Sequence, residues 1–259
     1  MGAFLERALP PTLALGGFLA IWEVLTRALD VPAYLVPPPS AVLAAALQEP
    51  STLLVGAMTT GRAALVGFAF SCAFGILAAI TLATSRRLER AFYPYTVFLQ
   101  TVPIVAIAPL LVLWFGPGLR AVAVSAFIVS VFPIIANTLA GLRSVDPALR
   151  DLFRLYGASR LATLVKLELP SAIPEIVTGL RVAAGLSVIG TIVGEFVAGF
   201  AEGAPGLGIV VLTSYRQLRT DVLFAAVLTA AGLGFTLFAL VNAVGRLLLR
   251  RWHASELSR

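Results

Sequence analysis

Six long apolar segments, separated by short polar connections, dominate the pattern of this sequence. They cover residues 9–29, 53–84, 91–115, 119–141, 174–200 and 222–249. An α-helix needs about 20 residues to cross the roughly 30 Å hydrocarbon core of a bilayer. Each segment reaches that length, and the pattern therefore predicts six transmembrane helices.

The composition supports a membrane protein. Hydrophobic residues make up 59% of the chain and charged residues 12%, whereas soluble domains have about 45–50% and about 25%. With a single cysteine, Cys72, and a single histidine, His253, we expect no disulfide within the chain and no metal site. The first segment ends without a small-residue cleavage site, so we expect it to be retained as a span. We predict an all-α membrane protein with one transmembrane domain over residues 1–259.

The positions of the basic residues predict the orientation of the helices. If the N-terminus is cytoplasmic, most of the 19 lysines and arginines fall on the cytoplasmic side, whereas the outer connections carry Arg120, Arg216 and Arg219. This excess predicts that both termini are cytoplasmic. We therefore read the net charge of +6 as a sign of membrane topology and expect no nucleic-acid partner.

Two features outside the charged loops predict local structure. A proline run in the first connection ends at Ser40, which we expect to cap a short interfacial helix. The second segment carries a small residue at every fourth position, a spacing that lets helix backbones approach closely in lipid. This stripe serves packing within one subunit or contact between subunits, and it consists of Ala63, Gly67, Ser71, Gly75, Ala79 and Ala83.

The connection between the fourth and fifth segments, residues 143–172, is charged and amphipathic. Asp146-Pro147 has the pattern of an N-cap followed by a first-turn proline. Gly157 is suited to end that helix in a left-handed conformation. The helix would carry one apolar face, formed by Leu149, Leu152, Phe153 and Tyr156.

A second short helix is expected in the same connection, capped by Ser159 and extending to about Glu168. We expect Pro170 and Pro174 to separate it from the fifth span. Two interpretations of the 143–172 loop remain open. It is an elbow that lies on lipid, or a lever whose apolar face docks into another protein.

The 143–172 loop resembles the cytoplasmic EAA loop of ABC importer permeases. The resemblance rests on Asp151-Leu152-Phe153, Gly157 and the later Leu169-Pro170, at the spacing of that family's motif. Asp151 replaces a glutamate, and Leu152 and Phe153 replace small alanines. Residues 21–42 and 101–116 are similar to segments of the branch that transports nitrate, sulfonates and taurine.

The resemblance implies a type I ABC importer permease fold in a bacterial inner membrane. It implies a second copy of the permease, two cytoplasmic ABC ATPase subunits that bind ATP and Mg, and an extracytoplasmic substrate-binding protein. Small anionic or polar substrates are implied, such as nitrate, sulfonate, taurine, aromatic carboxylates or pyrimidines. The residues implied to couple to the ATPase are Asp151, Leu152, Phe153, Tyr156, Gly157, Ala158, Leu169 and Pro170.

The chain itself lacks the Gly-x-x-x-x-Gly-Lys-Ser/Thr loop that binds nucleotide phosphates. We therefore expect a non-catalytic subunit that holds no cofactor. A stand-alone secondary transporter or channel is the alternative, although it would not explain the 143–172 loop.

Charged residues inside spans are candidates for function because they are costly in lipid. One face of the fifth span carries a stripe that either lines the translocation path or makes structural contacts: Arg181, Ala184, Val188, Thr191 and Glu195. For Glu23 in the first span we expect a structural partner on another helix, with Arg62 as a candidate. Kinks are expected at Pro103, Pro109 and Pro133, and Pro103 is a further candidate for the path.

The outer connection after the fifth span carries four charged residues, Glu202, Arg216, Arg219 and Asp221. They either dock the substrate-binding protein or are solvated loop charges.

Overall fold

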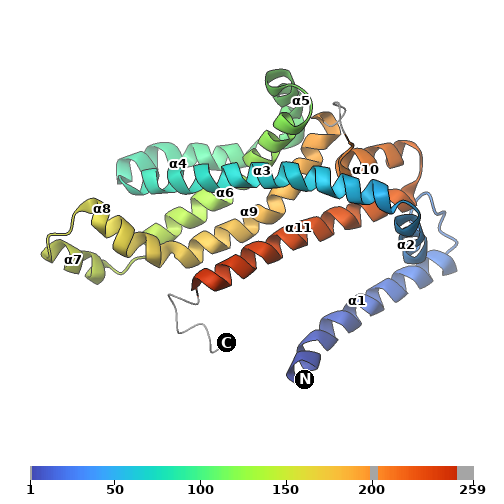
Figure 1. Cartoon of the computed structure of the whole chain (residues 1–259), viewed down its shortest axis with the longest axis horizontal. Coiled ribbons are helices and arrows are strands. Elements are labelled where there is room, and N and C mark those ends of the chain that lie inside the picture. The colour runs from blue at the N-terminus through green and yellow to red at the C-terminus, as the bar shows by residue number, and fades with distance from the viewer. Residues whose placement is uncertain (1, 199–203, 250–259) are drawn as a thin grey trace.

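The computed structural model describes residues 2–198 and 204–249 and shows a bundle of long helices in that part of the chain (Figure 1). Four of them, α3, α6, α9 and α11, lie side by side along the long axis. The helices in chain order are α1 (Gly2–Ala28), α2 (Pro39–Gln48), α3 (Pro50–Ala83), α4 (Arg86–Thr101), α5 (Ile104–Phe115), α6 (Leu119–Arg143), α7 (Pro147–Leu155), α8 (Arg160–Thr163), a π-helical segment (Leu164–Glu168), α9 (Leu169–Ala198), α10 (Leu207–Arg216) and α11 (Thr220–Leu249).

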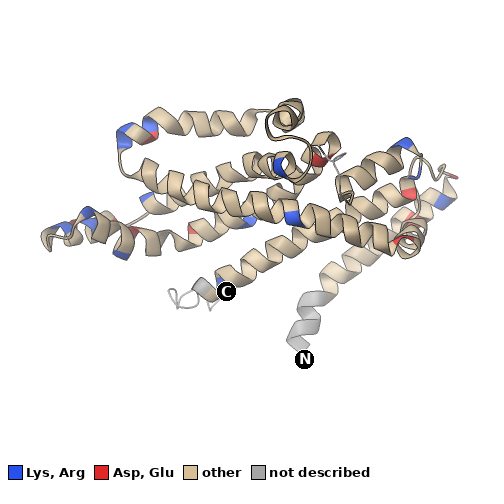
Figure 2. Ribbon diagram, turned by 45° about the horizontal axis from the view of Figure 1, so that its top comes forward, with Lys and Arg blue, Asp and Glu red and all other residues tan. Residues whose placement is uncertain are grey.

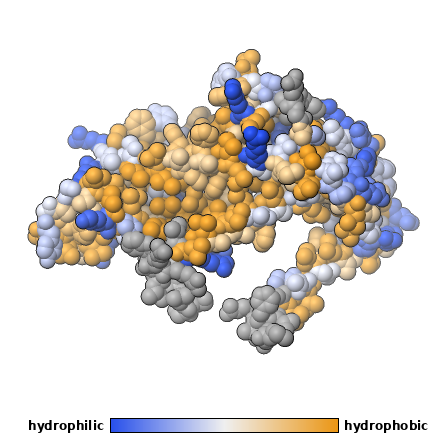
Figure 3. All heavy atoms as spheres, viewed as in Figure 1, coloured by the Kyte–Doolittle hydropathy of each residue, from blue (hydrophilic) through white to orange (hydrophobic). Residues whose placement is uncertain are grey.

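The hydrophobic surface agrees with a membrane location. Hydrophobic side chains cover much of the middle of the visible face, and hydrophilic ones gather mainly toward the end that carries α2 and α10 (Figure 3). Five described helices are long and apolar enough to cross a membrane, and a bent pair, α4 and α5, raises the number to six. The prediction of an all-helical protein with about six spans is therefore confirmed.

Small residues hold the centre of the bundle together. Within α3, the Ser71 hydroxyl donates to the Phe127 carbonyl of α6 at 3.1 Å and lies 2.7 Å from the Ser130 hydroxyl. Ala63, Ser71 and Ala79 are almost completely buried. The small-residue stripe of α3 thus packs within one subunit, as the first of its two interpretations predicted.

The third predicted span, residues 91–115, is bent far more strongly than the expected kink. It consists of α4 and α5, which meet at an angle of 98°. Between them, Val102 and Pro103 are in extended conformations. A proline lacks the backbone N–H needed inside a helix and disfavours the helical conformation of the preceding residue. The expected kink at Pro103 is therefore a complete break.

The short helix of the first connection begins two residues earlier than predicted. Pro38 is the N-cap of α2 and Pro39 its first residue, so Ser40 is not the N-cap. The Ser40 backbone N–H instead donates to the Glu23 carboxylate of α1 at 3.0 Å. Glu23 therefore accepts a hydrogen bond that a cap residue would otherwise accept.

Pro170 and Pro174 do not separate the 143–172 loop from the fifth span, contrary to the prediction. The helix that starts at Arg160 continues through the π-helical turns at Leu164–Glu168 directly into α9, and together they form one span of 39 residues. The Leu169 N–H bonds the Leu164 carbonyl, five residues earlier. The wider π turn lets the chain reach Pro170 without a break, although proline offers no N–H.

Candidate functional site

The 143–172 loop begins with a short, well-capped helix at one end of the bundle. The Asp146 carboxylate accepts the Ala148 N–H at 2.8 Å, and Pro147 is the first helical residue of α7. Gly157 follows with φ +65°, a left-handed conformation that costs other residues free energy. The Ala158 N–H then bonds the Phe153 carbonyl at 2.9 Å. The predicted caps of this helix, and of the next at Ser159, are confirmed.

The apolar face of α7 is unusually exposed. Leu155 and Tyr156 are each 83% exposed, and Leu149 and Leu152 each 44%, whereas Phe153 is half-buried. None of the residues of α7 is buried. The sequence analysis missed Leu155, although its spacing of three residues from Leu152 places the two on the same side of a helix.

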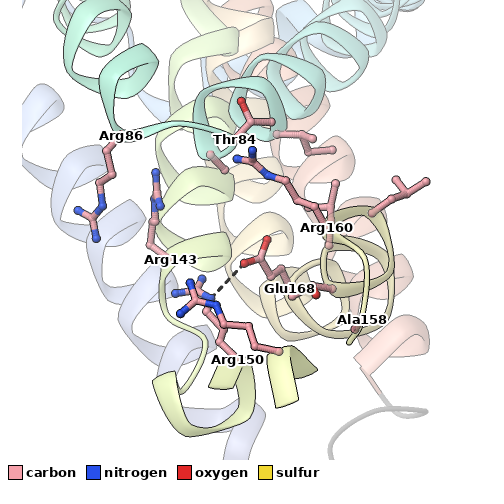
Figure 4. A pocket seen from close by; sticks show the side chains of 13 residues that line it. Thr84, Arg86, Arg143, Arg150, Ala158, Arg160 and Glu168 are labelled. Carbon is pink, nitrogen blue, oxygen red and sulfur yellow. Dashed lines mark hydrogen bonds and ion pairs between the residues drawn. The ribbon is translucent and has the colours of Figure 1, made fainter. Parts of the chain in front are cut away.

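Ion pairs connect the base of this loop to the ends of the spans. Arg150 of α7 donates to Glu168 of the π-helical segment at 3.0 Å and to the Leu142 carbonyl of α6 at 2.7 Å (Figure 4). Arg143, the last residue of α6, pairs with Glu89 of α4 at 2.5 Å. The loop is therefore attached to three spans, while most of the apolar face of α7 stays exposed.

The remaining residues implied to couple to the ATPase are spread over both parts of the loop. Asp151 is exposed and pairs with Arg154 at 3.4 Å, within the same helix. Leu169 and Pro170 are half-buried at the start of α9. The structure therefore brings the α7 residues together on one short helix and places Leu169 and Pro170 at the entry to the fifth span.

Glu195 lies near the other end of α9 and is only 3% exposed. Its carboxylate accepts the Thr60 hydroxyl of α3 at 2.8 Å and the Gly208 N–H of α10 at 2.7 Å. Thr60 in turn accepts the Leu207 N–H at 2.8 Å. A Cβ atom on Gly206 would overlap the carboxylate, so only glycine fits there. An anion is favourable at the N-terminus of α10 because unpaired N–H groups point toward it.

The rest of the α9 stripe is packed inside the chain. Ala184 and Val188 belong to a buried cluster with Ala64 of α3 and Leu237 of α11. Thr191 is fully buried. Arg181 is half-buried, and its Nε has no hydrogen-bond partner among the described residues. A role of these residues in translocation stays a prediction, as it does for Pro103, which lies exposed at the α4–α5 break.

Glu23 finds its partners close by rather than at Arg62. Its carboxylate accepts Arg27 Nε at 2.6 Å and the Ser40 hydroxyl at 2.7 Å. The expected structural partner on another helix is therefore Ser40 of α2, and Arg62 is wrong as the candidate. The carboxylate joins the end of α1 to the start of α2.

The outer charges divide into three groups. Glu202 lies outside the described residues. Arg219 pairs with Glu49 at 2.5 Å, so it ties the α10–α11 connection to the α2–α3 junction. Arg216 ends α10 and Asp221 lies in the first turn of α11. Docking of another protein at these positions stays a prediction.

Candidate metal ligands are sparse. No group of three or more His, Cys, Asp or Glu residues that could hold a metal ion occurs in residues 2–198 and 204–249.

Comparison with known proteins assigns the family. Residues 71–254 match the family described as "Binding-protein-dependent transport system inner membrane component". The chain is 35% identical over 249 residues to the "Riboflavin transport system permease protein RibX" of Chloroflexus aurantiacus, covering 95% of this chain and 90% of that protein. It is 33% identical over 244 residues to the "Formylaminopyrimidine transport permease protein ThiX" of Halalkalibacterium halodurans, covering 94% and 96%.

A solved structure shows the same fold. The chain is similar to a chain of the "MetNI methionine ABC transporter" in an inward-facing conformation, with a TM-score of 0.68, 20% identity, and coverage of 77% of this chain and 98% of that one. This confirms the predicted type I ABC importer permease fold. The chain belongs to the binding-protein-dependent transport system inner membrane component family, and it is a multi-pass permease subunit of an ABC transporter in the inner membrane.

Proposed function

We propose that this permease works as a homodimer and takes its energy from two cytoplasmic ABC ATPase subunits that dock on α7. The observation that carries the proposal is the exposed apolar face of α7, on a helix anchored through Arg150. Tyrosine is enriched among the anchors of protein interfaces, and an apolar helix face that lies in a groove of a partner protein is a common mode of docking.

The contacts of the loop support its role as a lever. Arg150 holds α7 to Glu168, and the helix from Glu168 continues without a break into α9. A movement of α7 would therefore reach α9 directly. At its far end α9 is held by Glu195 to α3 and α10, so these helices would move with it. ATP need only bind two states of the assembly with different affinities to shift their populations.

We place the substrate path between two copies of the permease. Ala184, Val188, Thr191 and Glu195 are buried by packing within the chain, so an open path through a single bundle would have to disrupt that packing. An interface between copies leaves it intact. In this arrangement α1, whose apolar side chains are largely exposed, has surface available for lipid or for the second copy.

A substrate-binding protein on the outer side would deliver a small polar or anionic molecule. The two relatives are named for riboflavin and for a formylaminopyrimidine, and members of one family thus carry different ligands. We propose that the binding protein makes most of the selection among nitrate, sulfonates, taurine, aromatic carboxylates and pyrimidines. Arg216, Arg219, Asp221 and Glu202 are the residues we propose for its docking.

Docking on α7 is tested by replacing its two most exposed side chains. We expect the double variant Leu155→Ala, Tyr156→Ala to lose at least about tenfold in affinity for the ATPase subunits, because anchor residues of this kind contribute about 2 kcal/mol or more to binding. The measurement is co-purification with the co-expressed ATPase, followed by ATPase activity in lipid nanodiscs with and without the binding protein.

The matched control is Leu113→Ala, Trp114→Ala, which removes one leucine and one aromatic ring from adjacent, largely exposed positions on α5. It should leave ATPase association unchanged. Normal association and stimulated hydrolysis in the α7 variant would refute the proposal. Solute flux through the permease without any ATPase would favour a secondary transporter or channel instead.

A further inference from the structure

A basic cavity of about 740 Å³ lies behind α7, between the loop and the ends of the spans (Figure 4). Its polar wall is formed by five arginines from four helices: Arg86 of α4, Arg143 of α6, Arg150 and Arg154 of α7, and Arg160 of α8. Arg160 extends across the cavity toward Thr84. Basic residues gather at this end of the molecule in Figure 2, and the excess of positive charge assigns it to the cytoplasmic side.

The charge of the cavity is not balanced by the protein. Arg143, Arg150 and Arg154 each pair with a carboxylate, on Glu89, Glu168 and Asp151 respectively. Arg86 and Arg160 form no salt bridge within the part of the chain that the structure describes. In addition, Arg143 Nε is buried without a hydrogen-bond partner there. Two guanidinium groups that face one cavity without a counter-ion favour an anionic ligand.

The other wall of the cavity is apolar. Ile80 and Ala83 of α3 lie on it, together with Leu161 and Leu164 from the helix that leads into α9. This wall lies beside the C-terminal end of α3, one of the candidate membrane spans. A ligand with a charged group and an adjoining hydrocarbon chain matches both walls, and basic pockets between spans on the cytoplasmic side suit anionic headgroups.

We propose that this cavity binds the phosphate group of an anionic phospholipid from the cytoplasmic leaflet, with Arg86 and Arg160 as its main ligands. Guanidinium groups bind phosphate oxygens in pairs of parallel hydrogen bonds. Because Arg86 starts α4 and Arg160 starts α8, one phosphate would join the α3–α4 turn to the 143–172 loop. Lipid composition would then influence the position of the loop.

An acidic protein surface is the competing ligand, and the geometry of α7 argues against it. Arg150 and Arg154 line the cavity and, at 100° per residue, point away from Leu152 and Tyr156 on the opposite side of the helix. The exposed apolar face and the arginine face are thus separate. A protein that docks on the apolar face would not need to contact the arginine face.

The test measures lipid binding to the purified full-length permease alone, so that its result does not depend on ATPase docking. Native mass spectrometry in detergent would follow titration with dioleoylphosphatidylglycerol, with zwitterionic dioleoylphosphatidylcholine for comparison and inorganic phosphate as a separate ligand. We expect wild type to prefer phosphatidylglycerol, and Arg86→Gln, Arg160→Gln to weaken that binding roughly tenfold or more, since each basic residue near an anionic headgroup contributes about 1 kcal/mol.

The matched control is Arg87→Gln, Arg90→Gln, which removes the same charge from exposed positions of α4 outside the cavity. It should change the affinity less than twofold. If both double variants lose the same lipid affinity, the lipid is attracted by the general positive charge of this end of the protein. That result would overturn the proposed binding site. Inorganic phosphate that binds as tightly as the lipid would overturn the lipid assignment in favour of a soluble anion.

A single variant covers the case in which the double variant fails to fold, and one further outcome would identify a different ligand. If the double variant does not fold, the single change Arg160→Gln replaces it, because this exposed residue forms no salt bridge in the described residues, and its lipid affinity should still fall severalfold. A variant that keeps its lipid affinity but no longer retains the ATPase would identify an acidic protein surface as the ligand and overturn the proposal.

Discussion

At the residue scale, the Glu195 carboxylate joins three helices in the interior of the bundle. It accepts hydrogen bonds from Thr60 of α3 and from the backbone of α10, while its own backbone belongs to α9. A buried carboxylate is costly unless it is well bonded, and here both oxygens have partners. We therefore interpret Glu195 as a residue that positions α10 against the outer half of the bundle.

Truncation of Glu195 should destabilise the protein measurably. Glu195→Ala leaves the Thr60 hydroxyl and the Gly208 N–H without their acceptor, and each unsatisfied buried group costs about 1–3 kcal/mol. We expect a clearly lower thermal unfolding midpoint. The midpoint is measured by the tryptophan fluorescence of the detergent-solubilised permease during heating. Glu195→Gln keeps one acceptor oxygen and the side-chain volume, so its unfolding midpoint should fall less than that of Glu195→Ala.

Glu175→Ala provides the comparison, because Glu175 is an exposed carboxylate on the same helix. Its midpoint should stay close to that of wild type. If Glu175→Ala lowers the midpoint as much as Glu195→Ala, the buried hydrogen bonds of Glu195 are not the cause of its effect.

At the element scale, the unbroken helix from Arg160 to Ala198 is the feature with the largest consequence for function. A flexible hinge at Pro170 would allow the 143–172 loop to move on its own. The continuous backbone, reinforced by the Arg150–Glu168 ion pair, instead joins the loop to α9, so we expect a movement of the loop to reach α9. Force transmission through this segment depends on the helical stiffness of the π-helical turns.

Glycines in these turns should uncouple transport from ATP hydrolysis. Each glycine in a helix costs about 1 kcal/mol relative to alanine and loosens the backbone. We expect Val165→Gly, Lys166→Gly to reduce substrate uptake into proteoliposomes severalfold while the ATPase still co-purifies. Val165→Ala, Lys166→Ala removes the same side chains but preserves the helix.

The alanine pair should transport at close to the wild-type rate. Equal losses for the glycine and alanine pairs would indicate that the Val165 and Lys166 side chains matter rather than the stiffness of the helix.

At the scale of the whole molecule, the distribution of charge defines two ends. Basic residues gather at the end of the molecule that carries α7 and α8, whereas acidic and basic residues are mixed at the end that carries α2 and α10 (Figure 2). Because cytoplasmic loops are richer in basic residues, we expect the end with α7 to be cytoplasmic. The apolar sides of the bundle between the two ends face lipid.

This orientation can be measured by labelling single cysteines. In a Cys72→Ala background, Leu155→Cys on α7 and Tyr215→Cys on α10 place exposed thiols at opposite ends of the molecule. We expect a membrane-impermeant maleimide to label Tyr215→Cys in spheroplasts with an intact plasma membrane, and Leu155→Cys only after the membrane is permeabilised. The reverse pattern would overturn the assigned topology.

The sequence by itself determined which segments become helices and where several of them begin and end. Asp146-Pro147, Gly157 and Ser159 each specify a cap through bonds to residues a few positions away, so local chemistry was sufficient for them. Hydropathy predicted the spans because burial in lipid depends on the composition of each segment. The motif of the 143–172 loop likewise needed only local spacing, and it led to the correct family.

Only the tertiary structure decided how distant residues meet. Glu195 and Thr60 are 135 positions apart, and the five arginines of the basic cavity come from four helices. Neither the right-angle break at Pro103 nor the continuous helix through Pro170 followed from the prolines alone, because a proline only removes an N–H and restricts its neighbour. Whether the helix then breaks or widens depends on the packing that surrounds it.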